Sequence, residues 1–191
     1  WNVIGVRTLQ GDYIGFEVEF EREILRESFE IIDALMVPVD EYRGIDFELE
    51  FRSSSDRSLF GEVELAYGDY YGGSSTRGEI ELSWRPSRFL QLDCELDSTL
   101  ARLPQEDFEV GTGSLGLRVT PTTHLSFNAI AQYDNQTETM GVNSRIRYII
   151  KSGSDLFLVF NKGFEREENG DRRSFRTTKT DAVAKLGWTF Q

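Results

Sequence analysis

The chain alternates without exception in the stretch Ile45-Asp46-Phe47-Glu48-Leu49-Glu50-Phe51-Arg52. Every odd position is apolar and every even position is charged, which is the pattern of a β-strand with one apolar and one polar face. An α-helix would spread the same residues around its circumference. The stretch therefore predicts a strand that lies between water and an apolar environment.

The same period of two recurs along the chain. It is clear in residues 13–24, 77–85, 90–97, 125–133 and 140–150, and weaker in residues 2–10, 59–70, 107–119, 156–163 and 181–190. These segments predict about eleven strands and no helix. The expected fold is all-β, an antiparallel up-and-down meander of long strands.

The composition of the chain excludes several classes of binding site. The chain of 191 residues has 33 acidic against 21 basic side chains and a formal net charge of −12. Nucleic-acid binding depends on neutralising phosphates with Lys and Arg, so nucleic acid is excluded as a partner. With one cysteine, Cys94, and one histidine, His124, the chain has no basis for an internal disulfide framework or a Cys/His zinc site.

The lengths of the connections between the segments indicate whether the sheet lies in a membrane or in water. Counted back from the C-terminus, long links such as 164–180 and 25–40 alternate with short links such as Gly11-Asp12. Outer-membrane β-barrels have short periplasmic turns and longer outside loops, and their strands span about 9–11 residues. We therefore expect a transmembrane barrel in the bacterial outer membrane, with a soluble β-barrel or sandwich that binds a small ligand as the alternative.

On the barrel interpretation, each strand presents one face to lipid and the other to the lumen. The predicted lipid-facing residues are Ile45, Phe47, Leu49, Ile80, Leu82, Trp84, Leu90, Leu92, Phe127 and Ile146. The predicted lumen-facing charged residues are Glu17, Glu19, Glu48, Glu50, Glu62, Glu64, Glu79, Glu81, Asp93, Glu95, Asp97, Arg145 and Arg147. Acids dominate this second set, so a pore lined by it is expected to favour cations.

Several motifs could be read as sites, and each has a simpler explanation. The stretch Gly111-Thr112-Gly113-Ser114-Leu115-Gly116 matches a dinucleotide fingerprint, but a strand follows it instead of the required helix. The acids of residues 93–97 continue the polar face of a strand. His124 opens a strand beside a turn and has no evident nucleophile as a partner. Cys94 lies on the apolar face of its strand, in line with the neighbouring leucines. We therefore expect no catalytic residue, no cofactor and no metal.

The end of the chain resembles the C-terminal assembly signal of bacterial outer-membrane barrels, through Gly187, Trp188 and Phe190. The hairpin 144–161 is similar to the penultimate hairpin of a family of large Gram-negative outer-membrane proteins, which join an N-terminal family-9-like carbohydrate-binding module to a C-terminal barrel of unassigned function. The resemblance covers about residues 11–191. It implies two partners. One is outer-membrane lipid, and the other is the barrel assembly machinery, which would bind the C-terminal strand.

These observations give one domain expectation and three hypotheses of function. Residues 1–191 are expected to be the C-terminal segment of a larger barrel, because eleven strands is an odd number and bacterial barrels have even numbers. The remaining N-terminal strands of the same protein would then be a further partner. The first hypothesis is a non-catalytic channel, porin-like, or a surface platform with a charged lumen. The alternatives are the soluble ligand-binding β-protein and an outer-membrane barrel enzyme with a site at the extracellular rim.

Overall fold

A computed structural model describes residues 2–32, 35–169 and 172–188. The described residues form strands and no helix. The strands are β1 (Asn2–Arg7), β2 (Tyr13–Ile24), β3 (Phe29–Ile32), β4 (Leu35–Val37), β5 (Glu41–Arg52), β6 (Leu59–Tyr70), β7 (Gly73–Ser87), β8 (Leu90–Arg102), β9 (Asp107–Val119), β10 (Leu125–Asp134), β11 (Thr139–Lys151), β12 (Ser154–Asn169) and β13 (Arg172–Trp188).

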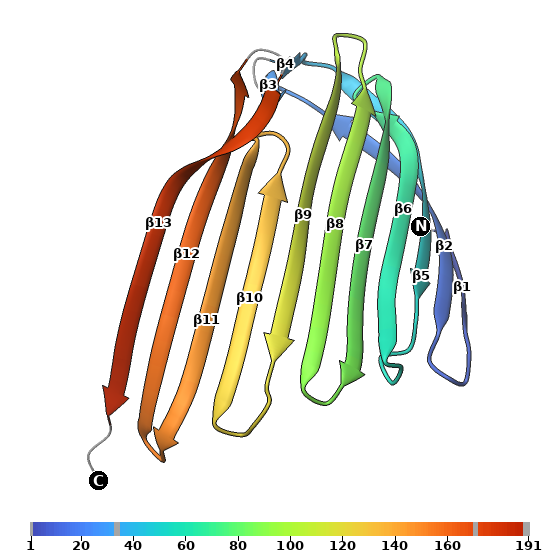
Figure 1. Ribbon diagram of the computed structural model, residues 1–191. Helices are drawn as coiled ribbons and strands as arrows, with labels where there is room; N and C mark the ends of the chain where they lie inside the picture. The colour runs from blue at the N-terminus through green and yellow to red at the C-terminus, as the bar shows by residue number, and fades with distance from the viewer. Residues whose placement is uncertain (1, 33–34, 170–171, 189–191) are drawn as a thin grey trace. The chain divides into compact units, whose positions relative to one another are not determined.

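Eleven of these strands form one sheet, in the order β1-β2-β5-β6-β7-β8-β9-β10-β11-β12-β13 (Figure 1). The prediction of an antiparallel meander with about eleven main strands is confirmed. The chain divides into two compact units, which are Trp1–Glu81 with Leu96–Gly111, and Leu82–Glu95 with Thr112–Gln191. We call them the first and the second unit and describe each by itself.

The first unit is organised by the register of β2, β5 and β6. Glu17 pairs with Glu48, and Glu48 pairs with Ala66. One position along, Phe16 pairs with Leu49, and Leu49 pairs with Leu65. Because directly paired residues point to the same side of a sheet, the carboxylates and the large apolar residues of these strands lie on opposite faces. We call these faces the polar face and the apolar face.

The second unit continues the same alternation. On its apolar face Phe127 pairs with Ile146, which pairs with Leu158. On its polar face Ser126 pairs with Arg147, which pairs with Phe157. Two-residue turns join β7 to β8 and β11 to β12, and the second of them places Gly153 at a φ of 78°. That backbone conformation is open to glycine at no steric cost.

One predicted link is confirmed and another is wrong. Residues 25–40 are the long link between the neighbouring strands β2 and β5, and β3 and β4 form a two-stranded hairpin within it. Residues 164–180 are largely strand, because β12 and β13 stay paired from Phe164 with Thr177 out to Asn169 with Arg172. Long links therefore do not alternate regularly with short ones.

The link between β6 and β7 is a tight turn. It consists of Tyr71 and Gly72 alone, with φ values of 45° and 82°. Positive φ at both positions is the geometry of the tight type I′ hairpin turn.

The buried hydrophobic residues of the described chain all belong to the first unit, and two of them lie in the β3–β4 hairpin. They are Leu35, Val37, Ala66, Ala101 and Leu103. Ala66 is on the polar face, because it pairs with Glu48. Phe29 of the hairpin contacts Tyr71 edge-on at 5.4 Å between ring centroids, and Tyr71 contacts Tyr42 at 5.2 Å. The hairpin is thus held against the end of the unit at which β6 turns into β7.

Candidate functional site

The exposure of β5 is the reverse of that of a strand in a soluble protein. Its apolar residues Phe47, Leu49 and Phe51 are 42%, 45% and 47% exposed. The carboxylates between them, Asp46, Glu48 and Glu50, are half-buried. Within the described residues, the apolar face of this strand thus has no protein layer over it, although burying such side chains is the main driving force of folding in water.

The apolar face is continuous across neighbouring strands. Phe16, Leu49 and Leu65 form one row across β2, β5 and β6, and each of the three is exposed. The predicted lipid-facing residues Ile45, Phe47, Leu82, Trp84 and Ile146 are exposed as well. The other members of that set, Ile80, Leu90, Leu92 and Phe127, are half-buried in β7, β8 and β10. A large exposed apolar surface marks contact with a partner or a membrane.

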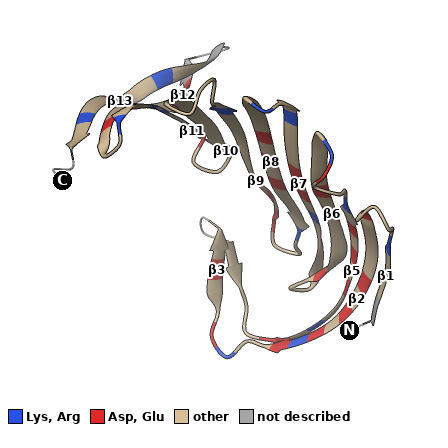
Figure 2. Ribbon diagram, turned by 90° about the horizontal axis from the view of Figure 1, so that it is seen from below, with Lys and Arg blue, Asp and Glu red and all other residues tan. Residues whose placement is uncertain are grey.

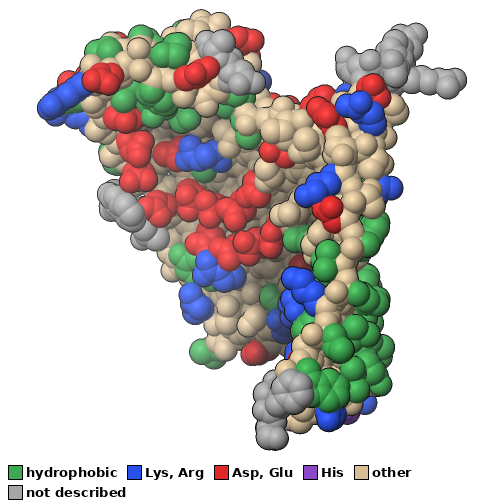
Figure 3. Space-filling view, turned by 90° about the vertical axis from the view of Figure 1, so that its left-hand side faces the viewer, with side chains coloured by type: hydrophobic (Ala, Val, Ile, Leu, Met, Phe, Trp, Pro, Cys, Tyr) green, Lys and Arg blue, Asp and Glu red, His purple; other side chains and the backbone are tan. Residues whose placement is uncertain are grey.

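The opposite face of the first unit carries a dense group of carboxylates. We call this group the acidic patch; its members are Glu17, Glu19, Asp46, Glu48, Glu50, Glu62 and Glu64. The register brings them together in like-charged pairs, with Glu17 opposite Glu48, Glu19 opposite Asp46, and Glu50 opposite Glu64. Red bands of Asp and Glu recur along β2 and β5 (Figure 2), and acidic side chains gather in one patch in the space-filling view (Figure 3).

Two arginines offset part of this charge. Arg52 forms ion pairs with Glu50 at 2.6 Å and with Glu62 at 2.5 Å. Arg77 forms an ion pair with Asp46 across the strands. Glu17, Glu48 and Glu64 form no ion pair with any described residue. The centre of the acidic patch therefore keeps an excess of negative charge at neutral pH.

Glycines on the polar face make room for a tyrosine. A Cβ atom built on Gly5 or on Gly15 would lie 2.5 Å from the hydroxyl oxygen of Tyr13. Gly5 and Gly15 are direct partners in β1 and β2. The Tyr13 ring thus lies across two positions without side chains, and the guanidinium of Arg7 lies 5.3 Å from its centroid.

The acids of β8 in the second unit are held by neutral donors. Ser83 and Gln91 both donate hydrogen bonds to Asp93, the latter at 2.8 Å. Ser114 donates a hydrogen bond of 3.0 Å to Glu95. The remaining predicted acids, Glu79 and Glu81 in β7 and Asp97 in β8, belong to the first unit.

Positive charge concentrates on the polar face of the second unit. Arg147 pairs with Phe157, and Phe157 pairs with Lys185. One row away, Arg118 and Arg145 lie on either side of Asn128. We call Arg118, Arg145, Arg147 and Lys185 the basic cluster. The guanidinium carbons of Arg145 and Arg147 lie 4.5 and 5.7 Å from the centroid of the Phe157 ring, a distance at which the ring attracts cations.

The sequence interpretation did not identify Arg118 or Phe157 as part of this surface. Arg118 belongs to a stretch whose alternation is weak, and Phe157 lies within Leu156-Phe157-Leu158-Val159-Phe160, where apolar residues on both faces hide the period of two. The polar neighbours of Phe157 on β11 and β13 were the available signal, but they are recognisable only once the register is known.

The motifs that were set aside as sites lie in strands, except His124, which was expected to open a strand. The glycine-rich stretch from Gly111 to Gly116 is part of strand β9, and His124 lies in the link before β10. Cys94 is a half-buried free cysteine of β8. No group of three or more His, Cys, Asp or Glu residues in the described chain is arranged to hold a metal ion. The described part of the chain has no helix long and apolar enough to cross a membrane.

At the C-terminal end, the structure describes two of the three predicted assembly residues. Gly187 pairs with Asp155, and Trp188 pairs with Ser154 at the end of β13. The ammonium group of Lys151 lies 4.4 Å from the Trp188 ring centroid. Phe190 lies outside the described residues.

No protein-family model matches the chain, and no curated protein matches it. A solved structure, described as the NanC porin in a rhombohedral crystal form, is similar over 98% of this chain and 98% of its own length, with 9% sequence identity and a TM-score of 0.40.

Proposed function

We propose that this chain is part of a transmembrane β-barrel of the Gram-negative outer membrane. The observation that carries the proposal is the exposure of β5, on which Phe47, Leu49 and Phe51 are exposed and the carboxylates between them are half-buried. In a bilayer this arrangement is the stable one, because lipid covers the apolar face and water in the lumen solvates the charges. Strands of 10–17 residues in β5–β13 are long enough to span the hydrocarbon core.

We further propose that the polar face lines a passage for small cations and that the chain carries no catalytic site. Rings of acidic side chains favour cations in a pore. The central carboxylates Glu17, Glu48 and Glu64 support this assignment, because they have no ion-pair partner in the described chain. If the barrel is plugged, the protein would act as a surface platform and would conduct no ions.

The resemblance at residues 144–161 supports a place in the larger outer-membrane proteins that carry a carbohydrate-binding module. The barrel assembly machinery is proposed to recognise the end of the chain, through Gly187 and Trp188 in β13 together with Phe190. Deletion of residues 188–191 is expected to reduce the amount of protein inserted in the outer membrane while leaving its synthesis unchanged.

The membrane assignment can be tested by quenching of Trp84 fluorescence. Trp84 is exposed and belongs to the apolar set of β7. The protein is reconstituted in vesicles of lipids brominated along the acyl chain, and the signal of a Trp84→Phe variant is subtracted to isolate Trp84. Strong quenching is expected. Equal Trp84 emission in brominated and ordinary lipids would contradict the proposal.

The conduction assignment is tested separately in a planar bilayer under a salt gradient. The sign of the reversal potential is expected to show cation preference, and a Glu48→Gln/Glu64→Gln variant should reduce it. Anion preference would contradict the assignment, whereas the absence of conductance would favour the plugged platform.

A further inference from the structure

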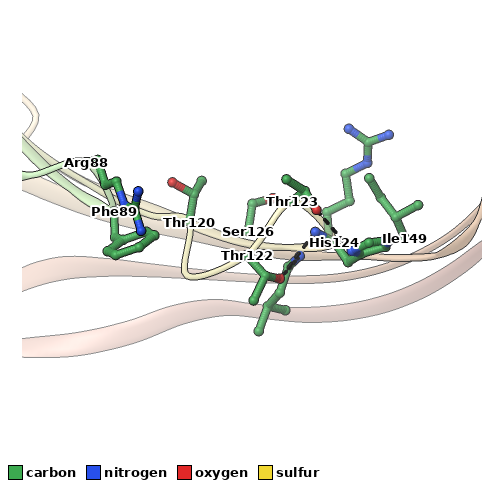
Figure 4. A pocket seen from close by; sticks show the side chains of 10 residues that line it. Arg88, Phe89, Thr120, Thr122, Thr123, His124, Ser126 and Ile149 are labelled. Carbon is green, nitrogen blue, oxygen red and sulfur yellow. Dashed lines mark hydrogen bonds between the residues drawn. The ribbon is translucent and has the colours of Figure 1, made fainter.

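A pocket of about 620 Å³ lies in the second unit beside the basic cluster. Its lining includes Arg88, Phe89, Thr122, His124, Ser126 and Arg147. Figure 4 shows Arg88 and Phe89 on one side of the pocket and His124 with Thr122 and Thr123 on the other. Ser126 and Arg147 are direct register partners, so both side chains emerge on the polar face.

The side chains of the pocket offer hydrogen-bond donors that the protein itself does not use. Thr122 Oγ1 accepts the backbone N–H groups of His124 and Leu125, at 3.2 and 3.1 Å, which leaves its hydroxyl proton free to donate. Nδ1 of His124 is 3.1 Å from the hydroxyl of Thr123, and its Nε2 has no partner among the described residues. The Ser126 hydroxyl likewise has no partner there.

The charge of the pocket is positive. Arg147 has one acidic partner, Asp155, at 2.8 Å. Arg88 lies over the Phe89 ring at 4.5 Å and forms no ion pair with a described carboxylate. Arg145 and Lys185, close by in the basic cluster, form none either. One carboxylate thus stands against several fixed cations.

We infer that this pocket binds a small organic oxyanion that also carries hydroxyl groups. A guanidinium presents a planar fork of N–H donors that matches the two oxygens of a carboxylate or two oxygens of a phosphate. Arg88, which forms no ion pair with a described carboxylate, would hold the anionic group, and the threonine and serine hydroxyls would bind the polar substituents. Arg147, which is separated from Arg88 by three strands and is paired with Asp155, would add to the positive potential of the pocket. The inference does not depend on conduction or on insertion in a membrane, because binding can be measured on protein in detergent.

Isothermal titration tests the inference. Citrate, which combines carboxylates with a hydroxyl, and inorganic phosphate are titrated separately into the detergent-solubilised full chain at low ionic strength. Saturable binding of either anion at one site is expected, and the stronger of the two identifies the preferred group. Added chloride should weaken binding by screening only.

Variants decide whether the pocket is the site. Arg88→Gln is expected to weaken binding about tenfold or more, because it removes a charge-assisted hydrogen bond. Arg147→Gln is expected to weaken binding less, because it removes only a nearby positive charge. Arg43→Gln is the matched control, since Arg43 forms an exposed ion pair with Glu41 in the first unit. Arg88 lies in a turn, so its variant keeps the test valid if the Arg147 variant does not fold. No saturable binding of either anion, or equal loss in the Arg43 control, would overturn the inference.

Discussion

Glu17 lies directly opposite Glu48 on the neighbouring strand, and neither carboxylate forms an ion pair with a described residue. Like charges placed directly opposite each other in a sheet are destabilising. Such a pair is tolerated where water screens the two charges or where the negative charge serves to bind or attract a ligand. In this chain the repulsion lies at the centre of the acidic patch, which is the surface proposed to attract cations.

The first prediction is that Glu48→Gln stabilises the protein. Removing one charge of the pair relieves repulsion worth about 0.2–1 kcal/mol. The free energy of unfolding in urea, measured in lipid vesicles at pH 7, should rise by that amount. Glu62→Gln is the control with the opposite sign, because Glu62 accepts hydrogen bonds from Arg52 at 2.5 and 2.7 Å. A loss of stability in Glu48→Gln would show that an attractive contact of Glu48 outweighs the repulsion.

The second prediction compares two neighbours on β6. Leu65 is on the exposed apolar face, and Glu64 is on the polar face opposite Glu50. Leu65→Arg should cost about 2–4 kcal/mol in a bilayer, as Arg does near the midplane of outer-membrane barrels. Glu64→Arg should cost far less, because its new charge would face Glu50. Equal costs, measured by unfolding from vesicles, would mean that lipid does not cover the apolar face.

The third prediction concerns the space under Tyr13. Gly15→Ala should cost about 1 kcal/mol, because the new Cβ atom would displace the Tyr13 ring. In a Tyr13→Ser background the same substitution should cost less, and the difference is the coupling energy of a double-mutant cycle. Gly141→Ala is the control, since nothing lies within 4 Å of a Cβ atom built there. Identical costs in the two backgrounds would rule out the contact.

The fourth prediction is a pH dependence that arises in the turn between β1 and β2. The backbone N–H of Ser54 and the Arg57 guanidinium hold the pKa of Asp12 below its ordinary value of 3.8. The stability contributed by the ionised carboxylate is therefore present above pH 3.8 and is lost as the pH falls through the lowered pKa. The unfolding midpoint of the wild type should fall more steeply than that of Asp12→Asn between about pH 5 and pH 2.5. Parallel curves would contradict the prediction.

The sequence predicts the main sheet well because one physical rule, the alternation of β-strand side chains, holds along most of it. The pairing of Glu17 with Glu48 and of Phe16 with Leu49 follows from that rule once the strands are placed in order. The class of fold, the number of main strands and the division into two faces therefore follow from the order of the residues alone.

The β3–β4 hairpin could not be predicted in this way. Its strands have four and three residues, too short for a period to show. What holds them is burial of Val37, which is 2% exposed, and the contact of Phe29 with Tyr71. Tyr71 follows β6, so the contact joins segments far apart in the chain. Burial and the hydrogen bond that Tyr71 donates to Glu23 raise the pKa of this tyrosine to about 12.

The outer part of β12 and β13 escaped prediction for a different reason. In the sequence, charged residues occupy both odd and even positions there, so no alternation marks the segment as strand. Their pairing is supported by charges across the strands, such as Glu165 opposite Arg176 at 3.7 Å. The basic cluster could not be predicted for a similar reason. Arg118 and Arg145 lie near each other only because both pair with Asn128 on the strand between them, and this register is not evident from the sequence.

The strict alternation of β5 also restricts how this protein can change length. One residue inserted before Asp46 would shift every later side chain of the strand to the opposite face. Phe47, Leu49 and Phe51 would then turn toward the acidic patch, and the carboxylates would turn toward lipid. Insertions and deletions should therefore survive in the links, or in steps of two within a strand. Natural relatives of this chain are expected to vary in loop length while the spacing of glutamate and phenylalanine in β5 stays fixed.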